Sequence, residues 1–446
     1  MSDFQNKKLN FFSATNLVVA NIIGAGIFTI SGYTLGSVPS VFGLLFIWFV
    51  GGILALCGAL VYGELTSIMP KSGGEYYYLS RIYHPILGFL SGFISLTAGF
   101  AAPVAAASLA FGKYLSAVIY GQSDDNLTKI LAILIIISMS VVHSTSLSLG
   151  SKIQNVLTAI KVALLLFFVI SGLLITPNPQ NISILPQSGD GSIIFSSGFA
   201  VSLIYISFAY SGWNAAAYMS EEVDNPQKNV PRALFTGTII VMALYLLINF
   251  VFVYSSSISD LQFKAEVGDV AARNIFGQQG GKIVSTMIAL ALTSSISAMI
   301  MAGPRVIQAM GKDFPIFAAF AKNNKNGIPS FAIIAQSAIS ILVVLSSELS
   351  NILNYIGFTL SIFTVLTVIG LMIYRFKHPH SQHIVRTPLY PIPPLLFLSL
   401  SLGMIIYNFI EKPNESLIGL ATLGVGIIIY FLTGQNKVQF LFHKDN

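Results

Sequence analysis

Two interruptions in long apolar stretches carry the chemistry that this sequence suggests. Gly24, Ala25 and Gly26 interrupt the first stretch, and Ser211 and Gly212 interrupt the sixth. A membrane-spanning helix must satisfy its own backbone hydrogen bonds, because hydrocarbon offers no partners, so an unwound turn at that depth lies against protein, water or a ligand. Breaks at corresponding positions of two halves point to a transporter's binding site. The pair of breaks therefore predicts a ligand site made of backbone groups.

The break in the first stretch suits an anion. The half-helix that resumes there presents N–H groups without intrahelical acceptors at a positive dipole end. The backbone of Gly24, Ala25, Gly26 and Ile27 is therefore predicted to bind a carboxylate. The alternative is a close helix contact through small residues, which is common in membranes. The second break favours the binding site.

The break in the sixth stretch suits a cation. Its first half-helix is predicted to end near Tyr210, and C-terminal carbonyls carry partial negative charge. The carbonyls of Phe208, Ala209 and Ser211 are predicted to bind an ammonium group, so that a zwitterion fits between the two breaks. The predicted pocket and gate residues are Tyr210, Gly212, Trp213 and Asn214. The aromatic residues among them also suit ordinary helix packing.

Lys161 is the one charged residue placed well inside a predicted span. It lies roughly 12–14 Å deep at the helical rise per residue, near the limit of snorkelling to the interface. A lysine at that depth is paired, neutral or in contact with water. We interpret it as an internal cation that bonds carbonyls of the first stretch, as a proton carrier, or as a snorkelling residue on a tilted helix. Its candidate partners in the eighth stretch are Ser294, Ser295 and Ser297, which also suit helix packing.

The composition indicates an all-α integral membrane protein. Hydrophobic residues make up 54% of the chain and charged residues 9%, against roughly a quarter charged in soluble proteins. Runs of about twenty apolar residues recur, as membrane helices require, and the alternating pattern of a membrane barrel is absent. About twelve spans are predicted, at 12–35, 41–63, 86–119, 130–143, 153–175, 193–219, 234–254, 282–307, 330–346, 351–374, 391–409 and 416–433.

The spacing of the breaks predicts the organisation of the chain. Helices 1–5 (about 12–175) and helices 6–10 (about 193–374) form two halves, and helices 11–12 (about 391–433) are an addition. An odd number of helices per half gives an inverted-topology repeat of the LeuT type. Residues 1–446 are expected to form a single transmembrane unit. Most of the 23 Lys and Arg lie on the side of the termini, which are therefore expected to be cytoplasmic. No basic patch for nucleic acid is present in the sequence.

Four ordered motifs carry a family resemblance. They are Ile-Gly-Ala-Gly-Ile-Phe at 23–28, Pro-Lys-Ser-Gly-Gly-Glu-Tyr at 70–76, Phe-Ala-Tyr-Ser-Gly-Trp-Asn at 208–214, and Gly-Pro-Arg-Val at 303–306. The chain resembles the amino acid–polyamine–organocation (APC) superfamily, near its L-type amino acid transporter branch. This resemblance implies a LeuT-like core, alternating access in the plasma (cell inner) membrane and an amino acid substrate. In similar permeases a lysine of the fifth helix stands where sodium binds in sodium-coupled relatives, and Lys161 matches that position. The resemblance therefore implies sodium-independent exchange or proton symport.

Substrate and partners follow from what the sequence lacks. No acidic residue falls at mid-membrane in the core helices, which favours neutral L-amino acids; cationic amino acids or polyamines are the alternative. Glu64 and Glu75 flank a cytoplasmic turn and are interpreted as structural. The animal L-type branch pairs with a glycoprotein through an extracellular cysteine, whereas the only cysteine here, Cys57, lies in an apolar run. No disulfide-linked subunit, cofactor or metal is expected.

Two other classes of protein compete with a transporter. A membrane-embedded enzyme would need a catalytic set in the bilayer, and His143, the sole histidine near it, has no acid beside it. A nutrient sensor would keep the same site without net transport but would need a signalling tail, and neither terminal tail is long enough to look like one. Glu221 and Glu222 follow the sixth stretch and are interpreted either as a cytoplasmic gate network or as a solvated loop.

Overall fold

The structure, a computed structural model, describes residues 8–24, 26–120, 124–264, 267–277, 279–346, 349–379, 384–411 and 413–433. These residues are mostly helical, and the β pairing among them is one bridge between Leu9 and Val223. The predicted all-helical class is therefore confirmed for this part of the chain.

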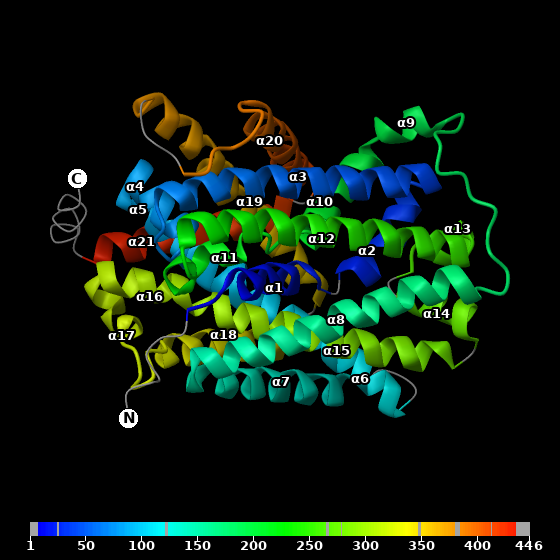
Figure 1. The fold of residues 1–446 in the computed structure, drawn as a ribbon, viewed down its shortest axis with the longest axis horizontal. Helices are drawn as coiled ribbons and strands as arrows, with labels where there is room; N and C mark the ends of the chain where they lie inside the picture. Colours follow the sequence, from blue (N-terminus) through cyan, green and yellow to red (C-terminus); the bar gives the residue numbers. More distant parts are fainter. Residues whose placement is uncertain are drawn as a thin grey trace.

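The helices before residue 195 are spread across the bundle in Figure 1, from α3 along the top to α7 along the bottom. They are α1 (Phe11–Ile22), α2 (Gly26–Ser37), α3 (Val41–Ile68), α4 (Glu75–Ile82), α5 (Pro85–Ile94), the π-helical η1 (Ser95–Ala101), α6 (Ala102–Tyr120), α7 (Asp125–Thr145), α8 (Leu147–Ile175) and α9 (Asp190–Ile194). The segment α5–η1–α6 runs as one continuous helix of 36 residues.

The remaining helices start with the second broken stretch. They are α10 (Ser197–Ala209), α11 (Ala215–Tyr218), the 3-10 helix η2 (Ser220–Glu222), α12 (Pro226–Ser255), α13 (Ile258–Leu261), α14 (Val267–Phe276), α15 (Gly280–Ala302), α16 (Pro304–Asp313), the 3-10 helix η3 (Pro315–Phe317), α17 (Ala318–Ala321), α18 (Ser330–Ser346), α19 (Leu349–Lys377), α20 (Ile392–Glu411) and α21 (Pro413–Leu432).

Several of these helices are long and apolar enough to cross a bilayer. Within the described residues there are seven, and α1 with α2 makes an eighth if the pair, bent by 41°, is one span. Four shorter apolar helices, Ser197–Ala209, Ser330–Ser346, Ile392–Tyr407 and Ser416–Leu432, accompany them. Long helices of this kind repeated through the chain make it a multi-pass membrane protein.

Helices at matching places in the two predicted halves pack against each other. The second pair, α3 and α12, lies side by side along most of the molecule in Figure 1. The third pair, α6 and α15, and the fourth pair, α7 and α18, are also in contact. The broken helices cross-pack as well, since α2 contacts α10 and α1 contacts α11. The breaks therefore lie together inside the bundle.

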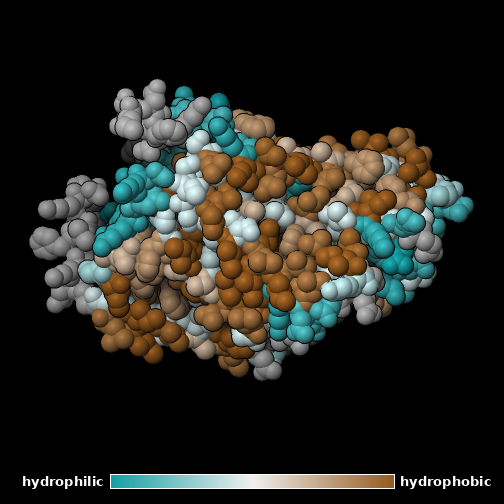
Figure 2. Space-filling model, turned by 90° about the horizontal axis from the view of Figure 1, so that it is seen from below, coloured by the Kyte–Doolittle hydropathy of each residue, from teal (hydrophilic) through white to brown (hydrophobic). Residues whose placement is uncertain are grey.

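The outside of the bundle is apolar. Exposed large hydrophobic side chains line α7 and α8, among them Leu134, Val141, Val156 and Ile170. Most of the face seen in Figure 2 is hydrophobic, and hydrophilic residues gather in separate patches, largely towards its two ends. Such an apolar surface is stable against lipid tails and not against water.

One end of the bundle carries both ends of the described chain, and we call it the terminal side. Leu9 pairs with Glu222 and Asp224 there, and α21 ends on the same side, on the left of Figure 1. The helix α12 starts from this side with Pro226 at its first turn, after Asn225 in a left-handed conformation. Proline suits this position because it has no N–H group, and the N–H groups of the first turn of a helix have no intrahelical acceptor.

Candidate functional site

The break after α10 depends on Gly212. Its φ is +93°, a conformation that L side chains rarely adopt, and a Cβ there would lie 2.9 Å from the carbonyl oxygen of Asn21. Glycine therefore permits both the turn and the close approach of the chain to the end of α1. The helix resumes at Ala215 as the single turn of α11.

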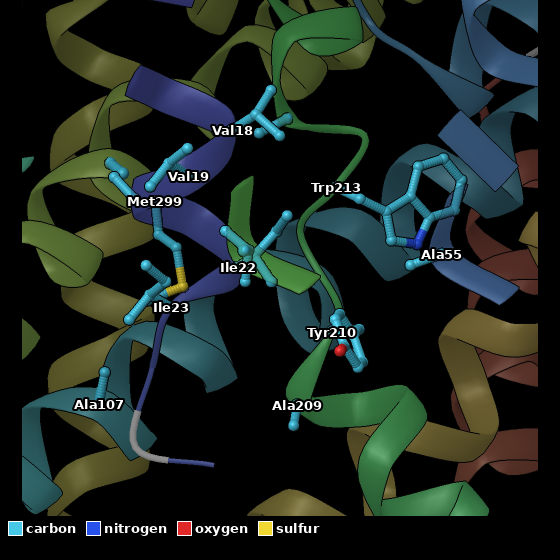
Figure 3. Packing of buried hydrophobic residues seen from close by; sticks show 14 of the residues in the cluster. Val18, Val19, Ile22, Ile23, Ala55, Ala107, Ala209, Tyr210, Trp213 and Met299 are labelled. Carbon is cyan, nitrogen blue, oxygen red and sulfur yellow. The ribbon is translucent and has the colours of Figure 1, made fainter. Parts of the chain in front are cut away.

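The two breaks meet at the hydroxyl of Tyr245 in α12. It lies 2.9 Å from the carbonyl oxygen of Ile22, at the end of α1, and 3.1 Å from that of Ala209, at the end of α10. Figure 3 shows these two helix ends facing each other, Ile22 and Ile23 on one and Ala209 and Tyr210 on the other. A phenol has one hydrogen, so it satisfies one of these carbonyls at a time. Two negative dipole ends thus converge on one point.

Tyr245 was not anticipated from the sequence. It lies within an apolar run with no motif around it. The one feature that could have marked it as a site residue is its hydroxyl group, a polar group inside a predicted span. Tyr210, which was predicted as a pocket residue, does line the pocket, but its hydroxyl donates to the carbonyl of Trp48 in α3 at 3.0 Å. It therefore also ties the end of α10 to α3.

The first break leaves the start of α2 with free amides. The N–H groups of Gly26 and Ile27 lie in its first turn, where no intrahelical acceptor exists. A Cβ on Gly26 would lie 3.0 Å from the Cβ of Ala209, so the start of α2 packs directly against the end of α10. A Cβ on Gly24 would lie 4.0 Å from the carbonyl oxygen of Ile22, an ordinary contact distance. Ala25 lies outside the described residues.

A pocket opens beside the second break. It is lined by most of the predicted residues of the sixth stretch, namely Phe208, Tyr210, Ser211, Gly212, Trp213 and Asn214. From α1 it is lined by Asn21, and Gly24, Gly26 and Ile27 are not among its lining residues. The carbonyls predicted to bind an amine are partly occupied, since Phe208 accepts from the amide of Ser211 and Ala209 from Tyr245. A carbonyl oxygen has two lone pairs, so each keeps one acceptor position.

Lys161 lies behind α1, away from this pocket, and is 0% exposed. Its ammonium group donates to the carbonyls of Ala20 at 3.0 Å and Ile23 at 2.7 Å, and to the Ser295 hydroxyl at 2.8 Å. Three acceptors match the three hydrogens of an ammonium group. The side chain therefore does not reach the membrane surface, which removes the snorkelling interpretation.

The other two predicted serines have different partners. Ser294 bonds Gln154 and Thr158 of α8, at 3.3 Å each. Ser297 lies 2.8 Å from Nε2 of His143 in α7. Of the three hydroxyls, Ser295 alone meets Lys161, because one residue of displacement turns a side chain by about 100° around a helix.

The two glutamates next to the turn after α3 have separate surroundings. Glu64 forms an ion pair with Arg375 at 2.7 Å, as the structural interpretation suggests. Glu75, in contrast, lines the pocket and is 4% exposed. Its carboxyl group accepts from Tyr62 and from Asn214 at 2.8 Å each, and from Tyr218. Burial raises the pKa of this carboxyl above its usual range, and the hydrogen bonds that it accepts oppose that rise.

Ion pairs join three segments at the terminal side. Arg305, almost fully buried in α16, donates to both carboxylate oxygens of Glu222, at 2.8 and 3.1 Å. Glu221 pairs with Lys71 at 3.4 Å and with Lys312 at 3.7 Å. These acids therefore belong to an ion-pair network and are not simply solvated.

Comparison with known proteins finds relatives over nearly the whole chain. Residues 9–432 match the family model described as amino acid permease. The human b(0,+)-type amino acid transporter 1 is 29% identical over 96% of this chain and 88% of its own length. The serine/threonine exchanger SteT of Bacillus subtilis is 30% identical over 94% of this chain and 96% of its own. The mouse large neutral amino acids transporter small subunit 2 is 27% identical over 96% of this chain and 81% of its own length. These relatives are transporters and not enzymes, and the chain belongs to the amino acid permease family.

Proposed function

We propose that this protein transports neutral L-amino acids across the membrane by alternating access. The observation that carries the proposal is the convergence of the Ile22 and Ala209 carbonyls on one point beside the pocket. A substrate ammonium group would share these carbonyls with the Tyr245 hydroxyl. The Phe208 and Ser211 carbonyls lie in the same turn and supply further acceptors.

The substrate carboxylate binds, in this proposal, at the start of α2. The amides of Gly24, Ala25, Gly26 and Ile27 are the donors that we assign. In support, α2 begins at Gly26, its first turn has free N–H groups, and a helix N-terminus attracts anions. Because the start of α2 packs against the end of α10, the anionic and cationic subsites adjoin, as a zwitterion requires.

The transport is proposed to be independent of sodium. Lys161 supplies a fixed positive charge to the carbonyls of Ala20 and Ile23 and to the Ser295 hydroxyl. These three oxygens are the kind of ligand that sodium would otherwise use, and together they accept all three hydrogens of the ammonium group. Ser294 and Ser297 link α15 to α8 and α7 through their hydrogen bonds and do not contact the ammonium group. The charge holds the break of α1 in place through the cycle.

We further propose twelve spans in a LeuT-like arrangement of five plus five helices with two added. The count combines the seven long helices, the α1–α2 pair and the four shorter apolar helices. The packing of α3 on α12, α6 on α15 and α7 on α18 supports an inverted repeat. The distribution of Lys and Arg supports cytoplasmic termini, and hence a cytoplasmic terminal side, in a cell membrane. The whole chain then acts as one unit.

The proposed substrates have small or medium neutral side chains. Apolar and aromatic groups dominate the pocket, including Leu54, Phe100, Trp213 and Met299. Two of the relatives are named for their substrates, one for large neutral amino acids and one for exchange of serine and threonine. One relative is named a small subunit; Cys57 is buried in α3, so we propose that no partner is attached through it by a disulfide.

Uptake into proteoliposomes tests this function. Radiolabelled serine and leucine are supplied outside vesicles that are empty or preloaded with the same amino acid, in sodium or in choline. We expect uptake that is saturable, equal in both salts and stimulated by preloading or by an inward proton gradient. Failure to transport any amino acid, or a strict need for sodium, would contradict the proposal.

A further inference from the structure

The pocket contains one acidic group that the proposed function does not use. Glu75 is the first residue of α4, and both its carboxyl oxygens accept hydrogen bonds from residues around the pocket. Tyr62 donates from α3, Asn214 from the turn after α10, and Tyr218 from α11. Asn214 also donates to the Tyr218 hydroxyl at 3.0 Å, which leaves the tyrosine hydrogen directed at the carboxyl group.

The cationic side chains near Glu75 are paired with other groups. Arg375 of α19 bonds Glu64, and Arg305 of α16 bonds Glu222. Arg81, in the last turn of α4, stacks on Tyr77 at 5.4 Å. In the described part of the chain, no lysine, arginine or histidine forms an ion pair with Glu75.

The remaining titratable groups around Glu75 are neutral or turned elsewhere. Tyr78 of α4 bonds the Thr66 hydroxyl, and Tyr76 bonds Asp313 of α16. The neighbouring helix α5 has no titratable side chain. A carboxylate among these groups would be a buried charge without a counter-ion, which is costly. The buried carboxylate therefore favours binding of a positive charge, which neutralises it.

The number of free acceptor positions selects the kind of positive charge. A carboxylate has about four acceptor positions, and they are taken by Tyr62, Asn214, Tyr218 and the backbone N–H of Glu75 itself. A proton needs only one oxygen of the carboxyl group and no further acceptor. An ammonium group brings three hydrogens and a guanidinium five, and the wall nearby is mostly apolar, with Phe100, Trp213 and Met299 among its residues. A substrate side-chain cation would thus leave most of its hydrogens unsatisfied.

We propose that Glu75 is a proton-binding site in the pocket and that its protonation is coupled to transport, making the protein a proton symporter. The inference rests on the proposed transport function. When the pocket is open to the outside, a hydronium ion gives its proton to a carboxyl oxygen of Glu75: an O–H bond of the hydronium breaks, an O–H bond of the carboxyl group forms, and water is left. When the pocket opens to the terminal side, Glu75 separates from Asn214 and Tyr218, water reaches the carboxyl group, the O–H bond breaks and the proton leaves to that water.

The coupling is measured as a ratio of rates, so that differences in expression or overall rate cancel. Uptake of labelled serine into empty vesicles is compared with and without an inward gradient of about two pH units, which can drive accumulation by about tenfold per unit for one proton. We expect a ratio well above one for the natural chain and a ratio of one for Glu75→Gln. The matched control is Asp125→Asn, which removes a carboxylate from the exposed start of α7 and should keep the natural ratio.

A second variant keeps the proposal testable if Glu75→Gln fails to fold. Tyr62 does not line the pocket, and Tyr62→Phe removes one donor to the carboxylate. A hydrogen bond to the charged form favours that form, so its loss should move the midpoint of the pH–rate profile to higher pH. An unshifted midpoint, or a Glu75→Gln ratio equal to the natural one, would overturn the proposal.

The remaining outcomes separate this inference from the function on which it rests. Transport by the natural chain that ignores the proton gradient would overturn the role of Glu75 and leave the transporter intact. Transport of labelled lysine that Glu75→Gln abolishes, with serine coupling unchanged, would show a substrate-cation site instead and overturn the proton assignment. Absence of any amino acid transport by the natural chain would overturn the proposed function itself.

Discussion

Replacing Lys161 with alanine tests how the first break is held open. The ammonium group is fully buried and bonds two carbonyls of α1 and one hydroxyl of α15. In the variant the Ile23 carbonyl keeps the Ser295 hydroxyl, which also donates to it. The Ala20 carbonyl loses its lysine donor. The end of α1 therefore loses a bond that its present geometry needs.

The size of the effect follows from that one carbonyl. A buried polar group without a partner costs about 1–3 kcal/mol, which corresponds to a roughly 5- to 150-fold change in an equilibrium. The folded chain is at the same time relieved of a buried charge, which offsets the loss in overall stability. We therefore expect transport to fall by about 5- to 150-fold while the yield of folded protein is retained.

The assay compares exchange rates in proteoliposomes at matched protein density. Lys152→Ala is the control, because Lys152 lies exposed on the same helix α8 and its replacement should leave the exchange rate unchanged. The vacated space is bordered by the oxygens of Ala20, Ile23 and Ser295, which suit a hard cation. Part of the rate should return in sodium and not in choline. A Lys161→Ala rate equal to the natural one would refute the role assigned to this charge.

Three further substitutions probe the junction of the breaks. Gly26→Val should weaken substrate affinity by about tenfold or more, or about 1.4 kcal/mol, because its side chain would press on Ala209; unchanged affinity in a binding titration would count against the carboxylate site. Gly212→Ala should cost roughly 1–2 kcal/mol from its positive φ alone, with more from contact with Asn21, and a natural melting temperature in detergent would contradict this. Tyr245→Phe leaves a buried carbonyl unsatisfied and should slow exchange by about 5- to 150-fold; a natural exchange rate would show that the hydroxyl is dispensable.

The helix breaks illustrate how far local sequence reaches. Gly24 and Gly26 were predicted to interrupt the first stretch, and the structure ends α1 at Ile22 and begins α2 at Gly26. Gly212 was predicted to interrupt the sixth, and α10 ends at Ala209. These positions could be predicted because a glycine weakens a helix wherever it stands.

Glu75 illustrates where local sequence reasoning fails. Next to a cytoplasmic turn, it was interpreted as structural together with Glu64. Glu64 does pair with Arg375, but Glu75 lies on the pocket wall. The preference for neutral substrates rested on finding no acid inside the spans, and it missed an acid that enters the pocket from α4. The depth of a residue next to a turn depends on how the helices around it pack.

The membrane class, the helical architecture, the family motifs and the places where two helices break could all be predicted from the amino-acid sequence. Hydropathy and helix-weakening residues are properties of short segments, so no long-range contact was needed to read them. Only the tertiary structure decided that Ser295 and not Ser294 or Ser297 meets Lys161, that Tyr245 joins the two breaks, and that Glu75 faces the pocket. Lys161 and Ser295 are 134 residues apart in the sequence, and Tyr245 and Ile22 are 223 residues apart. Their meeting depends on the rotation and crossing of packed helices, which the hydrophobic pattern of an almost uniformly apolar helix does not specify.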